Sequence, residues 1–268
     1  MKSKQPIGIF DSGIGGLTVA NAIATALPQE DFIYFGDTAH LPYGDKSSDT
    51  IRYYSLRIAK FLLDQNCKMV VVACNSASTA ASQVLLDFFQ ENTHFVNVVD
   101  PLVQACLNKS YSKVGVIATK ATIGSGVYQK ALKDGQDKLD VHALATPLFV
   151  PMIEEGFVHN QISQSIIENY LKDPGFQDMD ALLLACTHYP LIKSSIQAYL
   201  GPQIEIMESS EVAADMVKQI LTENQLLNPG PQQGKHKFYV SDLTDSFRQT
   251  AEHFYGEAIQ LEHLPLWD

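Results

Sequence analysis

The sequence repeats one short pattern, as VVVACNS at residues 70–76 and as LLLACTH at residues 182–188. In each stretch a run of apolar residues is followed by Ala-Cys and then by a small polar residue at which a helix can begin. Apolar side chains at consecutive positions are typical of parallel strands that are buried on both faces. The echo is short, but it predicts two similar half-structures, each presenting one cysteine from the same kind of position.

Apolar runs of this kind alternate with longer stretches of helical character along the whole chain. We expect strands at residues 7–10, 32–35, 69–73, 95–98, 114–118, 141–145, 181–185, 204–207, 237–240 and 258–261. We expect helices at residues 17–27, 48–65, 77–91, 121–133, 161–171 and 211–224. Strands that alternate with helices predict an α/β protein with mostly parallel sheets.

The length of 268 residues is comfortable for two domains of ordinary size. Pro101 is a candidate first boundary between them, and residues 207–210 are a candidate return point. Residues 228–235, which are rich in proline, glycine and glutamine, are typical of a surface connection.

The composition excludes several classes of protein. A hydrophobic fraction of 46% and a charged fraction of 18% are normal for a globular protein with a core. A net charge of −11 repels phosphates, so we expect no nucleic-acid partner. No apolar run approaches the ~20 residues that span a membrane, and residues 1–6 do not resemble a signal peptide. We therefore expect a cytoplasmic protein without a membrane partner. Backbone N–H groups can still bind an anionic substrate in a local site.

The four cysteines are Cys67, Cys74, Cys106 and Cys186. None forms a C-x-x-C pair, and no histidine lies at zinc-ligand spacing with a second cysteine, so we expect no metal site. Cys67 falls in a helix-to-strand connection and Cys106 in an apolar, helix-like stretch. We interpret both as structural.

Cys74 and Cys186 each fall at the carboxyl end of a predicted strand, where ligands bind in parallel α/β sheets. Each also precedes a helix, whose dipole and free N–H groups favour a thiolate. Either cysteine alone could be a small apolar residue packed in the sheet, but two in matching contexts favour a reactive pair. Two thiols that face each other across a cleft can remove a proton from one face of a carbon and deliver one to the other face. Such a pair inverts a stereocentre without a cofactor.

Two loops after the first strands carry further candidate residues. Residues 10–17 read FDSGIGGL and place Asp11 at the strand end, although a plain capped turn explains the glycines equally well. Residues 36–44 read GDTAHLPYG, in which Tyr43 and the Gly44 N–H are candidate ligands for a substrate carboxylate.

Two further residues are candidates from their position. His188 follows Cys186 by two residues, which favours a role in orienting or polarising that site over the structural role of most lone histidines. Glu154 precedes Gly156 and is a candidate partner for a substrate ammonium or for a neighbouring charge, although such a residue usually lies at a solvated helix end.

Taken together, these motifs resemble those of glutamate racemase. The matching stretches are GIFDSGIGG at 8–16, GD at 36–37, PYG at 42–44, ACNSAS at 73–78, GVIATKAT at 115–122, PMIEEG at 151–156 and CTHYPL at 186–191. They run in order over nearly the whole chain and are specific as a set.

The resemblance implies two pseudo-symmetric, doubly wound α/β domains with the active site in the cleft between them. Residues 1–99 and 210–268 would form the first domain, and residues 100–209 the second. The resemblance also implies interconversion of L- and D-glutamate without pyridoxal phosphate, metal or any other cofactor. It further implies a homodimer and a role in supplying D-glutamate for peptidoglycan.

The resemblance also implies a role for each matching residue. Cys74 would deprotonate D-glutamate with the help of Asp11, and Cys186 would deprotonate L-glutamate with the help of His188. Glu154 would be a supporting residue. The residues that would bind substrate are Asp11, Ser12, Tyr43, Gly44, Asn75, Ser76, Thr187 and His188. Ser76 departs from the threonine usual in the family; it keeps the hydroxyl but loses a methyl group.

Three other functions compete with this interpretation. An aspartate racemase or another isomerase of the same superfamily is the nearest, although the Asp-Ser-Gly-x-Gly-Gly and Pro-Tyr-Gly motifs favour the glutamate enzyme. A non-catalytic module that binds amino acids or anions would need neither cysteine. A thiol hydrolase needs only one cysteine, and a redox protein would space its thiols differently.

Overall fold

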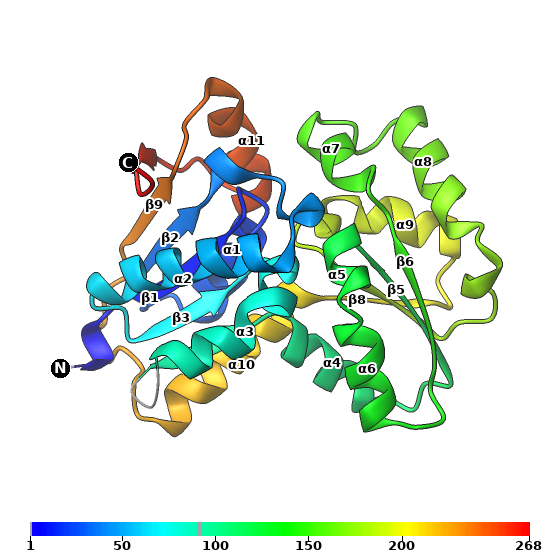
Figure 1. Cartoon of the computed structure of the whole chain (residues 1–268), viewed down its shortest axis with the longest axis horizontal. Coiled ribbons are helices and arrows are strands. Elements are labelled where there is room, and N and C mark those ends of the chain that lie inside the picture. The colour runs from blue at the N-terminus through cyan, green and yellow to red at the C-terminus, as the bar shows by residue number, and fades with distance from the viewer. Residues whose placement is uncertain (1, 90–92) are drawn as a thin grey trace.

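The computed structural model describes residues 2–89 and 93–268, and the strands in this part of the chain form two separate, entirely parallel sheets (Figure 1). The first sheet has the order β10-β9-β2-β1-β3-β4 and the second the order β6-β5-β7-β8. The first contains β1 (Ile7–Asp11), β2 (Phe32–Gly36), β3 (Met69–Val72), β4 (His94–Asn97), β9 (His236–Val240) and β10 (Leu261–His263). The second contains β5 (Lys113–Ala118), β6 (Asp140–Ala145), β7 (Ala181–Ala185) and β8 (Glu205–Glu208). The predicted fold class is confirmed.

Helices surround both sheets. Around the first lie α1 (Leu17–Ala26), α2 (Ser48–Asp64), α3 (Asn75–Phe89), α10 (Ser209–Glu223) and α11 (Asp245–Tyr255). Beside the second lie α4 (Val99–Leu107), α5 (Lys120–Gly124), α6 (Val127–Gly135), α7 (Phe149–Glu154), α8 (Gln161–Leu171) and α9 (Lys193–Leu200). At the centre of Figure 1, α10 and α4 contact each other where the two halves meet.

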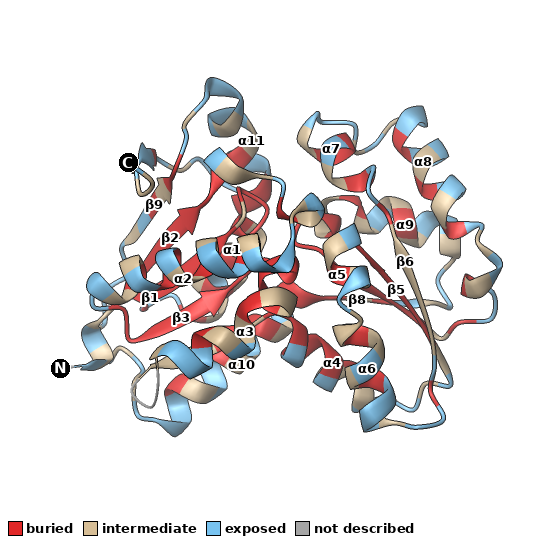
Figure 2. Ribbon diagram, viewed as in Figure 1, coloured by how far each residue is buried: buried red, intermediate tan, exposed pale blue. Residues whose placement is uncertain are grey.

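The apolar runs of the sequence become central strands with both faces covered. Every residue of β1, β3 and β7 is buried, and Figure 2 shows β1 and β3 in red. In β1, Ile7 and Ile9 join the core cluster that contains residues of α1 and α10, whereas Phe10 joins the cluster that contains residues of α2 and α3. Strands that are apolar on both faces require helices on both sides of the sheet, and this requirement produces the doubly wound arrangement.

The structure differs from the sequence-based prediction at several helices. The predicted helix 121–133 is two helices, because Gly126 between them has a left-handed backbone with φ of +68°. The predicted helix 77–91 begins at Asn75 and ends at Phe89, and its expected residues 90 and 91 lie outside the described residues. No residue range was predicted for α4, α7, α9 or α11, although Cys106 of α4 was expected in a helix-like stretch and a helix was expected after Cys186.

Two further differences concern Pro101 and the last strand. Pro101, the candidate boundary, lies in the first turn of α4 rather than in a linker, because a proline there needs no N–H partner. The last strand covers Leu261–His263 instead of 258–261. No helix in the described ranges is long and apolar enough to cross a membrane.

Candidate active site

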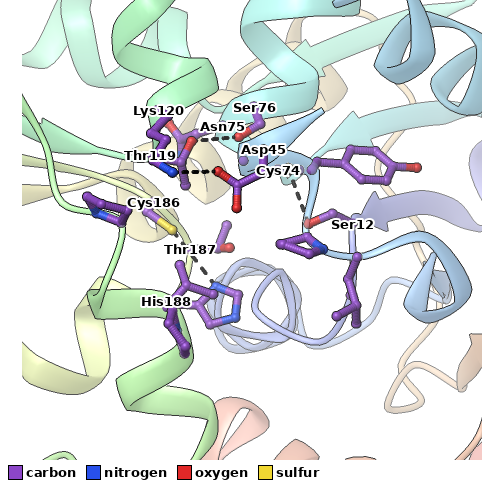
Figure 3. Close-up of a pocket in the computed structure, with 18 of the residues that line it drawn as sticks. Ser12, Asp45, Cys74, Asn75, Ser76, Thr119, Lys120, Cys186, Thr187 and His188 are labelled. Atoms are coloured by element: carbon purple, nitrogen blue, oxygen red, sulfur yellow. Dashed lines mark hydrogen bonds and ion pairs between the residues drawn. The ribbon is translucent and has the colours of Figure 1, made fainter. Parts of the chain in front are cut away.

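A cavity of about 360 Å³ lies between the two sheets and is lined from the carboxyl ends of strands in both (Figure 3). The first half contributes Ser12, Gly13, Leu41, Pro42, Tyr43, Gly44, Asp45, Cys74, Asn75 and Ser76. The second contributes Thr119, Lys120, Thr146, Pro147, Val150, Pro151, Glu154, Cys186, Thr187 and His188. Cys74 and Cys186 lie on opposite sides of this space in Figure 3. Every predicted site residue except Asp11 is among the lining residues.

Cys74 follows β3 and immediately precedes α3, as the sequence predicts. Its thiol lies 3.6 Å from Ser12 Oγ, and its sulfur accepts a hydrogen bond from the Ala77 N–H at 3.4 Å. Burial and the nearby Asp11 nevertheless raise the pKa of the Cys74 thiol to about 12, against the effect of the two hydrogen bonds. The expectation that the helix N-terminus favours a thiolate at Cys74 is therefore not met, because burial keeps the pKa of this thiol above neutral pH.

Cys186 has a different environment. The segment after β7 is a 3₁₀ turn at Tyr189–Ile192, so the helix expected directly after Cys186 begins only at Lys193. The Cys186 sulfur lies 3.9 Å from His188 Nδ1, and the Glu154 carboxylate lies 2.9 Å from His188 Nε2.

The charge of His188 follows from these two contacts. Burial lowers the pKa of the imidazole, but the hydrogen bonds to Cys186 and Glu154 outweigh burial and raise the pKa of His188 to about 10. His188 is therefore a cation at neutral pH, and a cation beside a sulfur stabilises a thiolate. The two sides of the cavity therefore differ: a buried carboxyl group, Asp11, lies near Cys74, and a cation, His188, lies beside Cys186.

Asp11 lies behind the residues that line the cavity and is not one of them. The side chain is fully buried, one carboxylate oxygen accepts the Gly13 N–H at 3.0 Å, and the other has no partner among the described residues. Burial raises the pKa of Asp11, whereas His188 and neighbouring backbone N–H groups lower it. Asp11 is not among the lining residues, and its negative charge contributes to the raised pKa of Cys74.

Tyr43 lines the cavity, but its hydroxyl is already bound. The phenol donates a 2.6 Å hydrogen bond to Asp37, a fully buried carboxylate that also accepts from Ser241 and Trp267. Burial and Asp37 raise the pKa of Tyr43 well above its ordinary value. The Gly44 N–H is therefore the candidate donor of this loop. A Cβ at Gly44 would lie only 2.9 Å from Thr119 Cβ of the other half.

Several lining residues were not predicted as site residues. Thr119 caps α5 and joins Ser76 and Thr122 in a cluster of hydroxyls, with Ser76 Oγ lying 2.9 Å from Thr119 Oγ1. Lys120 pairs with Asp45 of the first half at 3.2 Å, so this ion pair joins the two halves at the cavity. Thr119 directly follows β5 at the same sheet edge as Cys186, and this position is the signal that would have indicated it.

Cys67 and Cys106 lie outside the cavity, as a structural role requires. Both are buried, and burial raises the pKa of Cys67 to about 12 and that of Cys106 to about 11. Within residues 2–89 and 93–268, no group of three or more His, Cys, Asp and Glu side chains is arranged to hold a metal ion.

The raised pKa of His188 predicts how stability depends on pH. The folded protein keeps this proton up to a pKa of about 10, whereas an unfolded histidine loses it near 6.5. The stabilisation is complete below the unfolded pKa and is lost as pH rises through the folded pKa. We expect the free energy of unfolding to fall between these values by up to about 1.4 kcal/mol per pH unit from this group. Urea titrations of the wild type and of His188→Asn at successive pH values measure the difference in slope; equal slopes would contradict the assignment.

Comparison with known proteins identifies the family. A family model described as Asp/Glu/Hydantoin racemase matches residues 15–217. Glutamate racemase from Geobacter metallireducens is 43% identical over 254 residues, covering 94% of this chain and 93% of the relative. Glutamate racemase from Chlorobaculum tepidum is 40% identical over 260 residues, covering 96% of this chain and 94% of the relative.

The fold agrees with these sequence matches. The crystal structure of glutamate racemase from Francisella tularensis in complex with D-glutamate superposes with a TM-score of 0.93 at 39% identity, covering 99% of both chains. The chain thus has the fold of a racemase of the Asp/Glu/Hydantoin class, with two sheets and one thiol on each side of a shared cavity. Within that class, the chain belongs to the glutamate racemase family, as the sequence motifs predict.

Proposed function

We propose that the cavity racemises glutamate by proton transfer between Cys74 and Cys186, with no other group exchanging the α-proton. The observation that carries this proposal is the position of the two thiols, on opposite sides of one cavity and at the ends of strands in different sheets. Bases on opposite sides can reach opposite faces of a single carbon. The D-glutamate bound to the Francisella tularensis relative supports glutamate as the substrate.

The proposed reaction of L-glutamate begins at Cys186. The Cys186 thiolate, stabilised by His188, removes the α-proton and becomes a thiol. The Cys74 thiol delivers its proton to the opposite face of the carbanion and becomes a thiolate, so the product is D-glutamate. D-Glutamate reacts by the same steps in reverse. The negative charge of Asp11 raises the pKa of Cys74 and so favours its protonated form. Return of the protons through solvent restores the starting state.

The remaining lining residues would hold the two carboxylates and the ammonium of the substrate. Hydroxyl, amide and backbone donors line the cavity at Ser12, Tyr43, Gly44, Asn75, Ser76 and Thr187. Donors of this kind bind carboxylates well. Glu154 would act through His188, with which it pairs.

Several predictions from the resemblance belong to the same proposal. We expect domains formed by residues 1–99 with 210–268 and by residues 100–209, and the two separate sheets support this division. We also expect a homodimer in the cytoplasm and a role in supplying D-glutamate for peptidoglycan.

The proposal is tested by incubating the protein, free of metal and pyridoxal phosphate, with L-glutamate in D₂O. We expect the optical rotation to decay to zero while the α-proton signal disappears from the NMR spectrum. L-Aspartate is the control substrate and should keep both signals. Turnover of aspartate in place of glutamate would assign the chain to the aspartate enzymes, and exchange of neither by a folded protein would contradict racemisation.

A further inference from the structure

The amide of Asn75 is held at one end only. Asn75 is the first residue of α3 and lines the cavity, with 2% of its surface exposed. Its Oδ1 accepts a hydrogen bond from the Tyr128 hydroxyl at 2.6 Å. Its Nδ2 is buried and has no hydrogen-bond partner among the described residues. A buried amide donor without a partner costs free energy, and a ligand in the cavity can supply the missing acceptor.

Tyr128 reaches Asn75 from the other half of the molecule. It lies in the first turn of α6, which starts after the left-handed Gly126. Its ring is fully buried in the core cluster beside β5 and β7, where Leu132 and Val116 also pack. Tyr128 does not line the cavity, and proton transfer between the cysteines does not involve it. Because the ring is enclosed by the core, its hydroxyl can hold the Asn75 amide in one orientation.

The direction of this hydrogen bond decides which end of the amide is free. Burial, together with the negative charge of Asp100, raises the pKa of Tyr128 above its ordinary value, so the phenol keeps its proton and remains a donor. The amide oxygen of Asn75 is the acceptor that the structure gives to this hydroxyl among the described residues, so the phenol donates to it and leaves the amide nitrogen for other partners. If the amide were reversed, its oxygen would face the carboxylates of glutamate and repel them.

We propose that Tyr128 is a positioning residue that orients the Asn75 amide so that its N–H group donates to a carboxylate oxygen of the substrate. This inference rests on the proposed role of Asn75 in binding substrate. It accounts for a buried tyrosine hydroxyl whose hydrogen bond crosses from the second half of the molecule to a cavity residue of the first.

The test is the variant Tyr128→Phe, which keeps the ring and removes only the hydroxyl. We expect KM for L- and D-glutamate to rise about tenfold while kcat changes less than about threefold, because a hydrogen bond to a charged group is lost. Tyr111→Phe is the matched control, since it removes a tyrosine hydroxyl bound to Glu205 in the same half, away from the cavity. Its KM should equal that of the wild type.

The combination with Asn75→Ala separates positioning from a general effect on the fold. If Tyr128 acts through Asn75, Tyr128→Phe adds no further increase in KM once Asn75 is alanine. An equal increase in both backgrounds would overturn the positioning role. An increase with Asn75→Ala but none with Tyr128→Phe would overturn the inference and leave the role of Asn75 intact. No change with Asn75→Ala would instead contradict the proposed role of Asn75 itself.

Discussion

Replacing either Cys74 or Cys186 by serine is expected to lower the rate of glutamate racemisation by about 10²–10⁴-fold, the usual contribution of a general acid or base. One face of the α-carbon should remain reactive. With Cys74→Ser, the intact Cys186 can still exchange the α-proton of L-glutamate, and with Cys186→Ser, the intact Cys74 can still exchange that of D-glutamate. NMR in D₂O with each enantiomer measures both exchange rates separately from inversion.

The chain supplies two matched controls for this experiment. Cys67 and Cys106 are buried thiols outside the cavity, so Cys67→Ala and Cys106→Ala remove a sulfur without touching the site. Their racemisation rates should stay within about threefold of the wild type. The two-thiol mechanism is wrong if a serine variant at Cys74 or Cys186 still racemises at such a rate, or if both variants exchange the same enantiomer.

Adding one methyl group at Gly15 is expected to lower kcat by about 10²-fold, the cost of moving a catalytic group by roughly 1 Å. A Cβ at this position would overlap the His188 ring at Nδ1 and would lie 2.6 Å from Thr187 Oγ1. His188 has little freedom to move, because Glu154 holds its other nitrogen and the Phe254 ring packs edge-on against it at 5.0 Å. Gly15→Ala must therefore displace the imidazole from Cys186 or push back the loop that carries Ser12.

Gly124→Ala is the control for this steric effect. Gly124 is the last residue of α5, and a Cβ there meets nothing within 4 Å. Steady-state kinetics of the two alanine variants, with melting temperatures to verify folding, should show a loss of kcat only for Gly15→Ala. An unchanged kcat in Gly15→Ala would mean that the position of His188 is unimportant for turnover.

The central strands and the position of Cys74 and Cys186 at the cavity could be predicted because their signal is local. A run of buried apolar residues that ends at a polar residue marks both a strand and the sheet edge where ligands bind. The start of α4 was not predicted because Pro101 was interpreted as a boundary, although it lies in the first turn of this helix, where proline is tolerated.

The electrostatics of the site could not be predicted from local pattern. The helix after Cys74 suggested a thiolate, but burial beside Asp11 is a tertiary effect and outweighs the helix. The cation at His188 depends on Glu154, which comes from a different element. The ion pair between Lys120 and Asp45 likewise depends on the contact between the two halves.

The occurrence of the same strand–cysteine unit in both sheets has a consequence for chirality. A chain built from amino acids of one hand cannot form a mirror plane, so it cannot surround L- and D-glutamate with mirror-image sites. Instead, each sheet presents one thiol to the cavity. The neighbours of the two thiols differ, because Asp11 lies near Cys74 and His188 lies near Cys186. KM and kcat can therefore differ between the enantiomers, whereas kcat/KM must be equal for both, because enantiomers have the same free energy in water.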